Sequence, residues 1–196
     1  MELDELAHAA FMGANYHLEK IKKLINSPGM QTILDKNIDE PTKKKLQNDV
    51  YLFHWHLRAF FWEMVATFDT ILHWVNQKYK LGLKEGEVKW VNIHNMVNKF
   101  NINQSEWKNK YTLLENAWNS EWYYEVRKYR NFAHRAFLFV QGEYFEEVNY
   151  DNSKFKQNTT WLLPVRKDQE NCFDIIEQLS HYLEEMRQLG ENIFRK

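Results

Sequence analysis

Apolar residues recur every three or four positions through most of the chain, which is the spacing that places them on one face of an α-helix. Ser27-Pro28-Gly29 interrupts the pattern after the first helix, and Pro41 is typical of the first turn of the long helix that follows. The pattern predicts helices over residues 3–26, 30–38, 41–79, 88–100, 105–118, 119–139 and 168–194. Residues 50–75 are apolar nearly all round, so we expect them to form the central, most buried helix.

The stretch from residue 141 to residue 165 has a different character, because β-branched and aromatic residues replace the helical pattern. Residues 144–150 and 155–165 favour strands, and the polar residues 151–153 between them favour a turn. A β-hairpin and a long irregular arm are both compatible with this pattern. The predicted fold is all-α: one domain over residues 1–196, built as an up-and-down bundle of five to seven helices with a small hairpin or arm before the last helix.

Composition supports a single packed domain. Aromatic residues make up 16% of the 196 residues, which is too many for a disordered chain, and the 6 Gly and 3 Pro leave few turns. Cys172 is the single cysteine, so an intramolecular disulfide is excluded and a reducing, cytoplasmic location is expected. His54, Arg58 and Asp69 lie in the most apolar stretch, which argues against a membrane span. The net charge of −1 gives no global attraction for nucleic acid, so an anion site must be local.

Residues 126–135 read VRKYRNFAHR and hold the most suggestive polar groups of the chain. On a helical wheel, one sector about 100° wide takes the polar side chains Ser120, Tyr123, Arg127, Arg130, Asn131 and His134. The opposite half takes the apolar side chains Trp118, Trp122, Val126, Tyr129 and Phe132.

The chemistry of this polar sector suits a phosphodiester. Arginine is a fixed, bidentate donor for phosphate, histidine moves protons near neutral pH, and asparagine can orient a phosphate or a ring. The sector could therefore hold a phosphodiester and deprotonate a hydroxyl beside it, with Tyr123 and Tyr124 as faces for base stacking. An ordinary solvated helix face is the alternative interpretation of the same residues.

The same segment resembles the signature helix of the HEPN superfamily of helical nucleotide-binding domains, in which an arginine is followed four to six residues later by a histidine near the end of a helix. Two alignments fit the resemblance: Arg127 as the family arginine, or Arg130-Asn131 as a shifted version of the family's Arg-Asn pair, each with His134 as the histidine. The resemblance implies a helical bundle that acts on or binds RNA, and a homodimer in which two such helices face each other.

For members that retain catalysis, the resemblance implies a metal-independent endoribonuclease without a cofactor. His134 would take the proton of an RNA 2′-hydroxyl, and Arg127 with Arg130 would stabilise the charge that develops on phosphorus. Asn131 would orient the phosphate or the imidazole. The RNA-binding residues would be Tyr123, Tyr124 and Arg135. The alternatives are a HEPN-like module without catalysis, used in a defence, toxin–antitoxin or signalling assembly, and an unrelated helical bundle with a metal or small-ligand pocket.

Besides His134, the chain has seven histidines that could serve as metal ligands. None of them pairs with another at the i, i+4 spacing that places two ligands on one helix face. A metal site would need His17 to meet His56 or His73, and also His134, across helices. We expect no metal site, because each histidine is better explained as an ordinary core or surface residue.

Overall fold

The computed structural model describes residues 2–32, 37–100, 105–133, 141–147, 156–164 and 172–195. These residues form seven α-helices, one short 3₁₀ helix and three strands. In chain order the elements are α1 (Leu3–Ile25), α2 (Pro28–Gln31), α3 (Glu40–Lys78), η1 (Glu85–Glu87), α4 (Trp90–Phe100), α5 (Ser105–Asn119), α6 (Glu121–Ala133), β1 (Gln141–Glu147), β2 (Lys156–Pro164), β3 (Cys172–Asp174) and α7 (Ile175–Phe194). The all-α bundle predicted from the sequence is confirmed.

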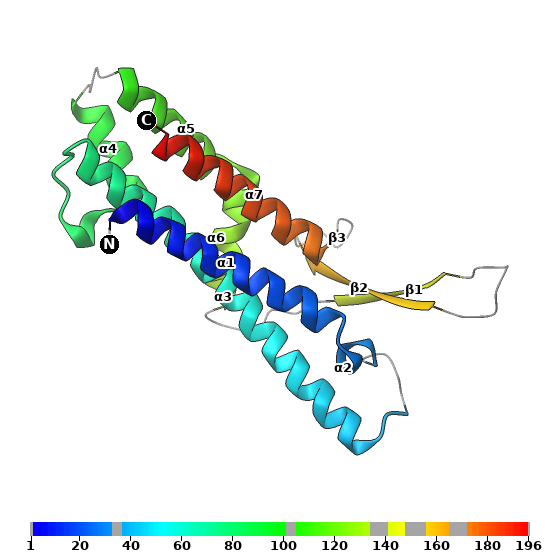
Figure 1. The fold of residues 1–196 in the computed structure, drawn as a ribbon. Helices are drawn as coiled ribbons and strands as arrows, with labels where there is room; N and C mark the ends of the chain where they lie inside the picture. The colour runs from blue at the N-terminus through cyan, green and yellow to red at the C-terminus, as the bar shows by residue number, and fades with distance from the viewer. Residues whose placement is uncertain are drawn as a thin grey trace.

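The centre of the bundle is α3, a helix of 39 residues against which α1 runs in the opposite direction (Figure 1). It begins where Asp39 accepts a hydrogen bond from the backbone N–H of Thr42, at 2.9 Å, which satisfies one of the free amides of the first turn. Its inner face buries a row of large apolar side chains, so that most of its stability comes from packing. The row consists of Phe53, Leu57, Phe60, Phe61, Met64, Phe68, Ile71 and Leu72.

The turn between α1 and α3 is held by a buried carboxylate. Ser27 caps α2 and donates a hydrogen bond from its hydroxyl to Oδ2 of Asp49 on α3, at 2.7 Å. Asp49 is 8% exposed, and Gly29 packs so closely against it that a Cβ atom at this position would overlap the carboxylate. The glycine in this turn is therefore required by the close approach of α2 to α3.

Aromatic stacking joins α3 to α6 on the other side of the bundle. The ring of Phe61 stacks on Tyr129 with centroids 5.0 Å apart, and the ring of Phe68 stacks on Tyr123 at 4.2 Å. Such offset pairs add to the stabilisation that burial of the rings provides. They fix which face of α6 is turned inward, and this determines which of its polar residues can reach solvent.

The three strands form one antiparallel sheet in the order β1-β2-β3, and β1 and β2 extend away from the helices (Figure 1). The register pairs Gln141 with Leu162 and Glu147 with Lys156, so the β-hairpin, one of the two interpretations of residues 141–165, is confirmed.

The start of the last helix was predicted too early. Residues 172–174 form β3, and α7 begins only at Ile175, because Asp174 accepts hydrogen bonds from the backbone N–H groups of Ile176 and Glu177. Backbone pairing with β2 and this cap together outweigh the helical spacing of the apolar residues before Ile175.

Two further expectations need correction. The short helix expected over residues 30–38 is the single turn Pro28–Gln31, and residues 33–36 of that range lie outside the described residues. Residues 50–75 are not buried all round, since Trp55 is 51% exposed and Trp62 is 40% exposed. Within the described part of the chain, no helix has the length and apolar character needed to cross a bilayer.

Candidate functional site

Ser120 separates α5 from α6 and thereby determines where the helix that carries the arginines begins. The Ser120 hydroxyl donates to the carbonyl of Ala117 at 2.6 Å and accepts from the backbone N–H of Tyr123 at 3.3 Å, so it closes α5 and opens α6. Trp118 therefore belongs to α5 and is not part of the helix that carries the arginines. The single helical wheel drawn through both residues places Trp118 wrongly, on the far side from Arg127.

Arg127 lies against the end of α5. Its guanidinium stacks on the ring of Trp118 at 3.8 Å, and its Nη2 donates to the Trp118 carbonyl at 3.0 Å. The Nε group makes a longer bond of 3.4 Å to the carbonyl of Tyr123. Burial lowers the pKa of Arg127, and the neighbouring tyrosines oppose this shift. A cation bonded to the last carbonyls of a helix stabilises that helix end, so Arg127 joins α5 to α6.

Arg130 lies one turn further along, where α6 meets α3. Its guanidinium lies 4.9 Å from the ring centre of Trp62, and its Nη1 donates to the side-chain oxygen of Asn131 at 3.0 Å. The Nε atom of Arg130 is buried and has no hydrogen-bond acceptor among the described residues. Loss of hydration raises the pKa of Asp69 on α3, and the positive charge of Arg130 opposes that rise.

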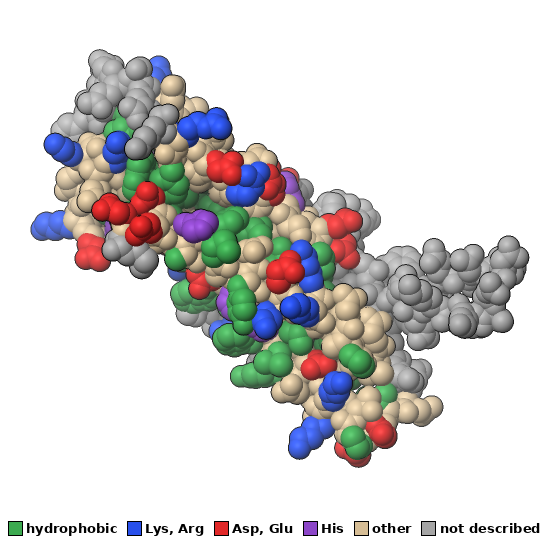
Figure 2. All heavy atoms as spheres, in the orientation of Figure 1, with side chains coloured by type: hydrophobic (Ala, Val, Ile, Leu, Met, Phe, Trp, Pro, Cys, Tyr) green, Lys and Arg blue, Asp and Glu red, His purple; other side chains and the backbone are tan. Residues whose placement is uncertain are grey.

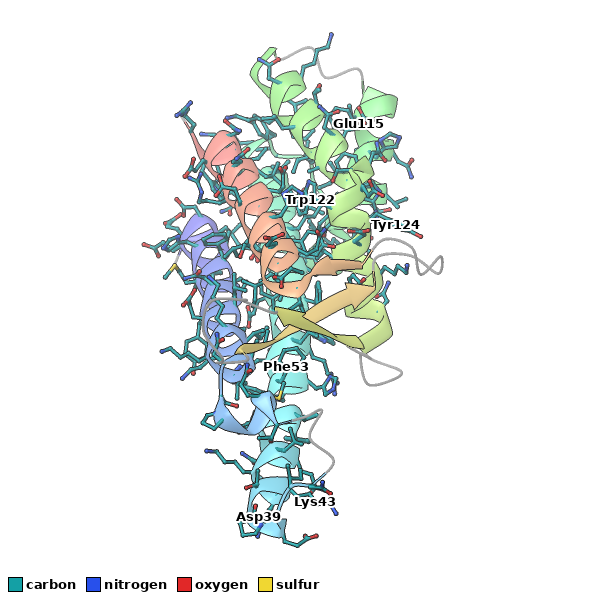
Figure 3. The ribbon with its side chains drawn as sticks, turned by 90° about the vertical axis from the view of Figure 1, so that its right-hand side faces the viewer. Asp39, Lys43, Phe53, Glu115, Trp122 and Tyr124 are labelled. Atoms are coloured by element: carbon teal, nitrogen blue, oxygen red, sulfur yellow. The ribbon has the colours of Figure 1, made fainter. Side chains whose placement is uncertain are left out.

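The two tyrosines expected to stack on bases differ completely in their surroundings. Tyr123 is 1% exposed, and burial raises its pKa well above the ordinary value, so the expectation that its ring is on the surface is wrong. The inward face of α6 is fixed by its stacking on Phe68, which the wheel of α6 alone did not indicate. Tyr124 is 60% exposed and lies on the outer side of α6, away from Trp122 (Figure 3). Its ring is open to solvent.

The structure thus places Arg127, Arg130 and Asn131 on the last two turns of α6, with Asn131 exposed and both arginines half-buried. His134 and Arg135, the other predicted site residues, lie outside the described residues, directly after the end of α6 at Ala133. Arg127 and Arg130 differ in the partners of their guanidinium groups. Arg127 donates two hydrogen bonds to backbone carbonyls, whereas Arg130 donates to the side chain of its neighbour Asn131.

The site also contains residues that sequence reasoning missed, namely Trp62 and Asp69 on α3 and Trp118 on α5. Each contacts an arginine of α6 or acts on its charge, but each comes from a different helix. The sequence holds one usable signal for two of them: Trp62 and Asp69 lie seven residues apart and therefore share a face of α3.

Among the described residues, two of the histidines considered as metal ligands, His17 and His56, lie in contact. Nδ1 of His17 on α1 lies 2.8 Å from Nδ1 of His56 on α3, and burial lowers the pKa of both rings. His73 instead lies near Asp69, where its charge acts on that carboxylate. No three potential metal ligands are gathered anywhere in the described ranges.

A cavity of about 370 Å³ lies between α1, α3 and α7, away from the arginines of α6. Its wall is mainly apolar, and its Arg187 is already bonded to Glu184 and Glu191 of the same helix. The lining residues that matter for a ligand are Ala7, Phe11, Ile71, Met186 and Phe194. A small apolar molecule fits this description, which is the observation that favours a ligand-binding bundle as an alternative function.

Comparisons of the chain with known protein families, curated proteins and solved structures find no match. The chemistry of the α6 edge therefore follows from its own side chains. A half-buried guanidinium beside an exposed amide and an exposed indole offers charge-assisted donors to an anion and a ring face to a base.

Proposed function

We propose that this chain is a HEPN-like domain that acts on RNA, as a metal-independent endoribonuclease that works as a homodimer. The observation that carries the proposal is the pair Arg130 and Asn131 at the edge of the last turn of α6, four and three residues before His134 in the sequence. This is the arginine–asparagine–histidine order of the family resemblance, on a helix that ends at Ala133.

Of the two arginines, Arg130 is the better candidate for the reacting phosphate. Arg127 is stacked on Trp118 and bonded to backbone carbonyls, so taking up a phosphate would cost contacts that hold α5 against α6. Among the described residues, Arg130 donates only to its neighbour Asn131, so its other N–H groups bond to no described acceptor. It would grip two oxygens of a phosphodiester at once, as the planar guanidinium allows.

The proposed reaction is an internal transesterification. His134 takes the proton from the 2′-hydroxyl, and the 2′-oxygen attacks the adjacent phosphorus. The bond from phosphorus to the 5′-oxygen breaks, and that oxygen takes a proton from water, leaving a 2′,3′-cyclic phosphate and a 5′-hydroxyl. Arg130 stabilises the charge on the phosphorane, and Asn131 orients it. In the homodimer, the α6 edges of both copies would face one cleft.

The test is cleavage of end-labelled single-stranded RNA in the presence of a chelator, with His134→Ala and Arg130→Ala as the main variants. We expect each to lower the rate at least about 100-fold, the usual contribution of a general base or of one charge-stabilising donor. The 2′,3′-cyclic end is identified by its resistance to phosphatase until acid opens it.

His8→Ala is the matched control for the histidine, because His8 is an exposed residue at the far end of α1. Lys128→Ala is the matched control for loss of a positive charge on α6 itself. Equal rates for the parent protein and His134→Ala would remove the proposed base. Intact RNA with tight binding would instead support the non-catalytic module.

A further inference from the structure

One face of α3 exposes an unusual series of side chains. Counting along the helix in steps of four and three residues gives Lys44, Asn48, Tyr51, Trp55, Arg58 and Trp62, and all six are exposed. We refer to these six residues as the α3 strip. With a rise of 1.5 Å per residue, the strip is roughly 27 Å long. Figure 2 shows hydrophobic side chains beside Lys and Arg side chains over α1 and the neighbouring part of α3.

The rings of the strip are large and open to solvent. Tyr51 is 62% exposed, Trp55 is 51% exposed and Trp62 is 40% exposed, although each lies on the helix that forms the centre of the bundle. Trp55 is held at the seam with α1, where its ring meets those of His17 and His56 edge-on, with centroids 5.6 and 4.7 Å away. A Trp ring fixed in this way is a preorganised platform, because its orientation is set before a ligand arrives.

The charge of the strip has a single sign. Lys44 and Arg58 are cationic, and the other four positions of the strip are neutral. Arg58 is in no ion pair with a described carboxylate. Acidic residues on the same face lie only beyond the ends of the strip: Glu40 four positions before Lys44, and Asp69 seven positions after Trp62 and close to Arg130. Cations that alternate with exposed rings complement a polyanion with unpaired bases.

The strip also ends at the proposed reaction site. Trp62, its last member, lies beneath the guanidinium of Arg130, with 4.9 Å between the guanidinium carbon and the ring centre. Nucleotides that follow the strip past Trp62 would therefore reach Arg130 next.

We propose that the α3 strip binds the single-stranded RNA that flanks the phosphodiester held by Arg130. Bases stack on Tyr51 and Trp55, Lys44 and Arg58 contact phosphates, and Trp62 supports the guanidinium of Arg130. The inference rests on the proposed function, since it takes RNA as the substrate. It adds that the RNA is unpaired over several nucleotides, because a paired base cannot offer its face to a tryptophan.

Binding is tested apart from cleavage with a fluorescein-labelled 2′-O-methyl RNA of mixed sequence, which lacks the attacking hydroxyl. We expect Trp55→Ala to weaken binding by at least about fivefold, as loss of one stacked base implies, and Trp55→Phe to keep most of the affinity. Arg58→Ala should weaken binding and reduce its dependence on salt by about one phosphate contact. Val91→Ala and Lys108→Ala, exposed residues on α4 and α5, should bind as the parent protein does.

The proposal is overturned if Trp55→Ala and Arg58→Ala bind like the controls, or if duplex RNA binds as tightly as the single strand. It is also overturned if Trp55→Ala leaves RNA affinity unchanged and instead converts a dimer to a monomer in light scattering, because the strip would then be a contact between two copies. If the parent protein cleaves RNA and both Trp55→Ala and Arg58→Ala keep its RNA affinity, the role of the α3 strip is refuted and the proposed catalysis is not. Strip-dependent binding by a protein that cleaves nothing refutes the proposed catalysis and supports the strip.

Discussion

The buried contact between Tyr182 and Glu125 gives a direct test of how α7 is held against α6. The hydroxyl of Tyr182 donates to Oε2 of Glu125 at 2.5 Å, and the two residues are 0% and 3% exposed. Burial, together with this hydrogen bond, raises the pKa of Tyr182 far above its ordinary value, so the phenol stays protonated and continues to donate. Tyr182→Phe removes this donor and leaves the ring in place.

The size of the effect follows from the charge and the burial of the acceptor. A hydrogen bond to a charged group contributes about 1.5–3 kcal/mol, and its loss leaves a desolvated carboxylate with one donor fewer. Gln178 lies 3.5 Å from the same oxygen and compensates part of the loss, so we take about 2 kcal/mol. For a domain of this length, that lowers Tm by about 4 to 8 °C.

Urea unfolding followed by tryptophan fluorescence measures this loss, with a lower midpoint and an unchanged slope expected. Tyr124→Phe is the matched control, because it removes the same hydroxyl from a ring that is 60% exposed. Equal unfolding free energies for Tyr182→Phe and Tyr124→Phe would refute the claim that this bond stabilises the packing of α6 on α7.

Three further outcomes are expected. Burial lowers the pKa of His17 and His56 in the folded state, so the unfolded state binds more protons. The urea midpoint should therefore fall as the pH drops below the ordinary histidine pKa of about 6.5, and it should be flat above that pH. His17→Asn should reduce this fall, and a pH profile like that of the parent protein would contradict the prediction. Gly29→Ala should destabilise the protein by about 1–3 kcal/mol by displacing the carboxylate of Asp49, measured by thermal unfolding, whereas Ala at the open position Gly86 should be neutral. Arg127→Lys should lower the free energy of unfolding by about 1–2 kcal/mol, because an ammonium group cannot both stack on an indole and bond the carbonyls. A thermal melting curve like that of the parent protein would show that the contact of Arg127 with α5 does not stabilise the fold.

The helices could be predicted because their signals are local. Ser27-Pro28-Gly29 marks the end of the first helix in the sequence and Pro41 marks the start of the long one, and α1 and α3 begin and end within one residue of the predicted bounds. The start of α7 was missed because its competitor is not local. Residues 172–174 pair with β2, and nothing in their own sequence identifies that partner strand.

The site was harder to predict than the fold, because a helical wheel shows only one helix. It grouped Tyr123 with Arg127 correctly by angle, yet it could not show that Phe68 of α3 covers the ring of Tyr123. It also could not show that Trp118, which lies on α5 before the interruption at Ser120, stacks on the guanidinium of Arg127. The position of a polar residue on a helical wheel therefore does not show whether its side chain reaches solvent until the packing of the neighbouring helices is known.

Three arginines of α3 and α6, namely Arg127, Arg58 and Arg130, differ in a way that follows from their surroundings. Arg127 is desolvated and bonded to backbone carbonyls, so its guanidinium is already engaged in the contact between α5 and α6. Arg58 is exposed on the outer face of α3, where its charge is available but unfocused. Arg130 lies between these extremes, half-buried against an indole and near Asp69, and its buried Nε has no acceptor among the residues that the structure describes. Under the proposed function, an incoming phosphate binds the terminal nitrogens of Arg130 in preference to those of Arg127, because partial burial strengthens the attraction and no backbone carbonyl among the described residues competes for them.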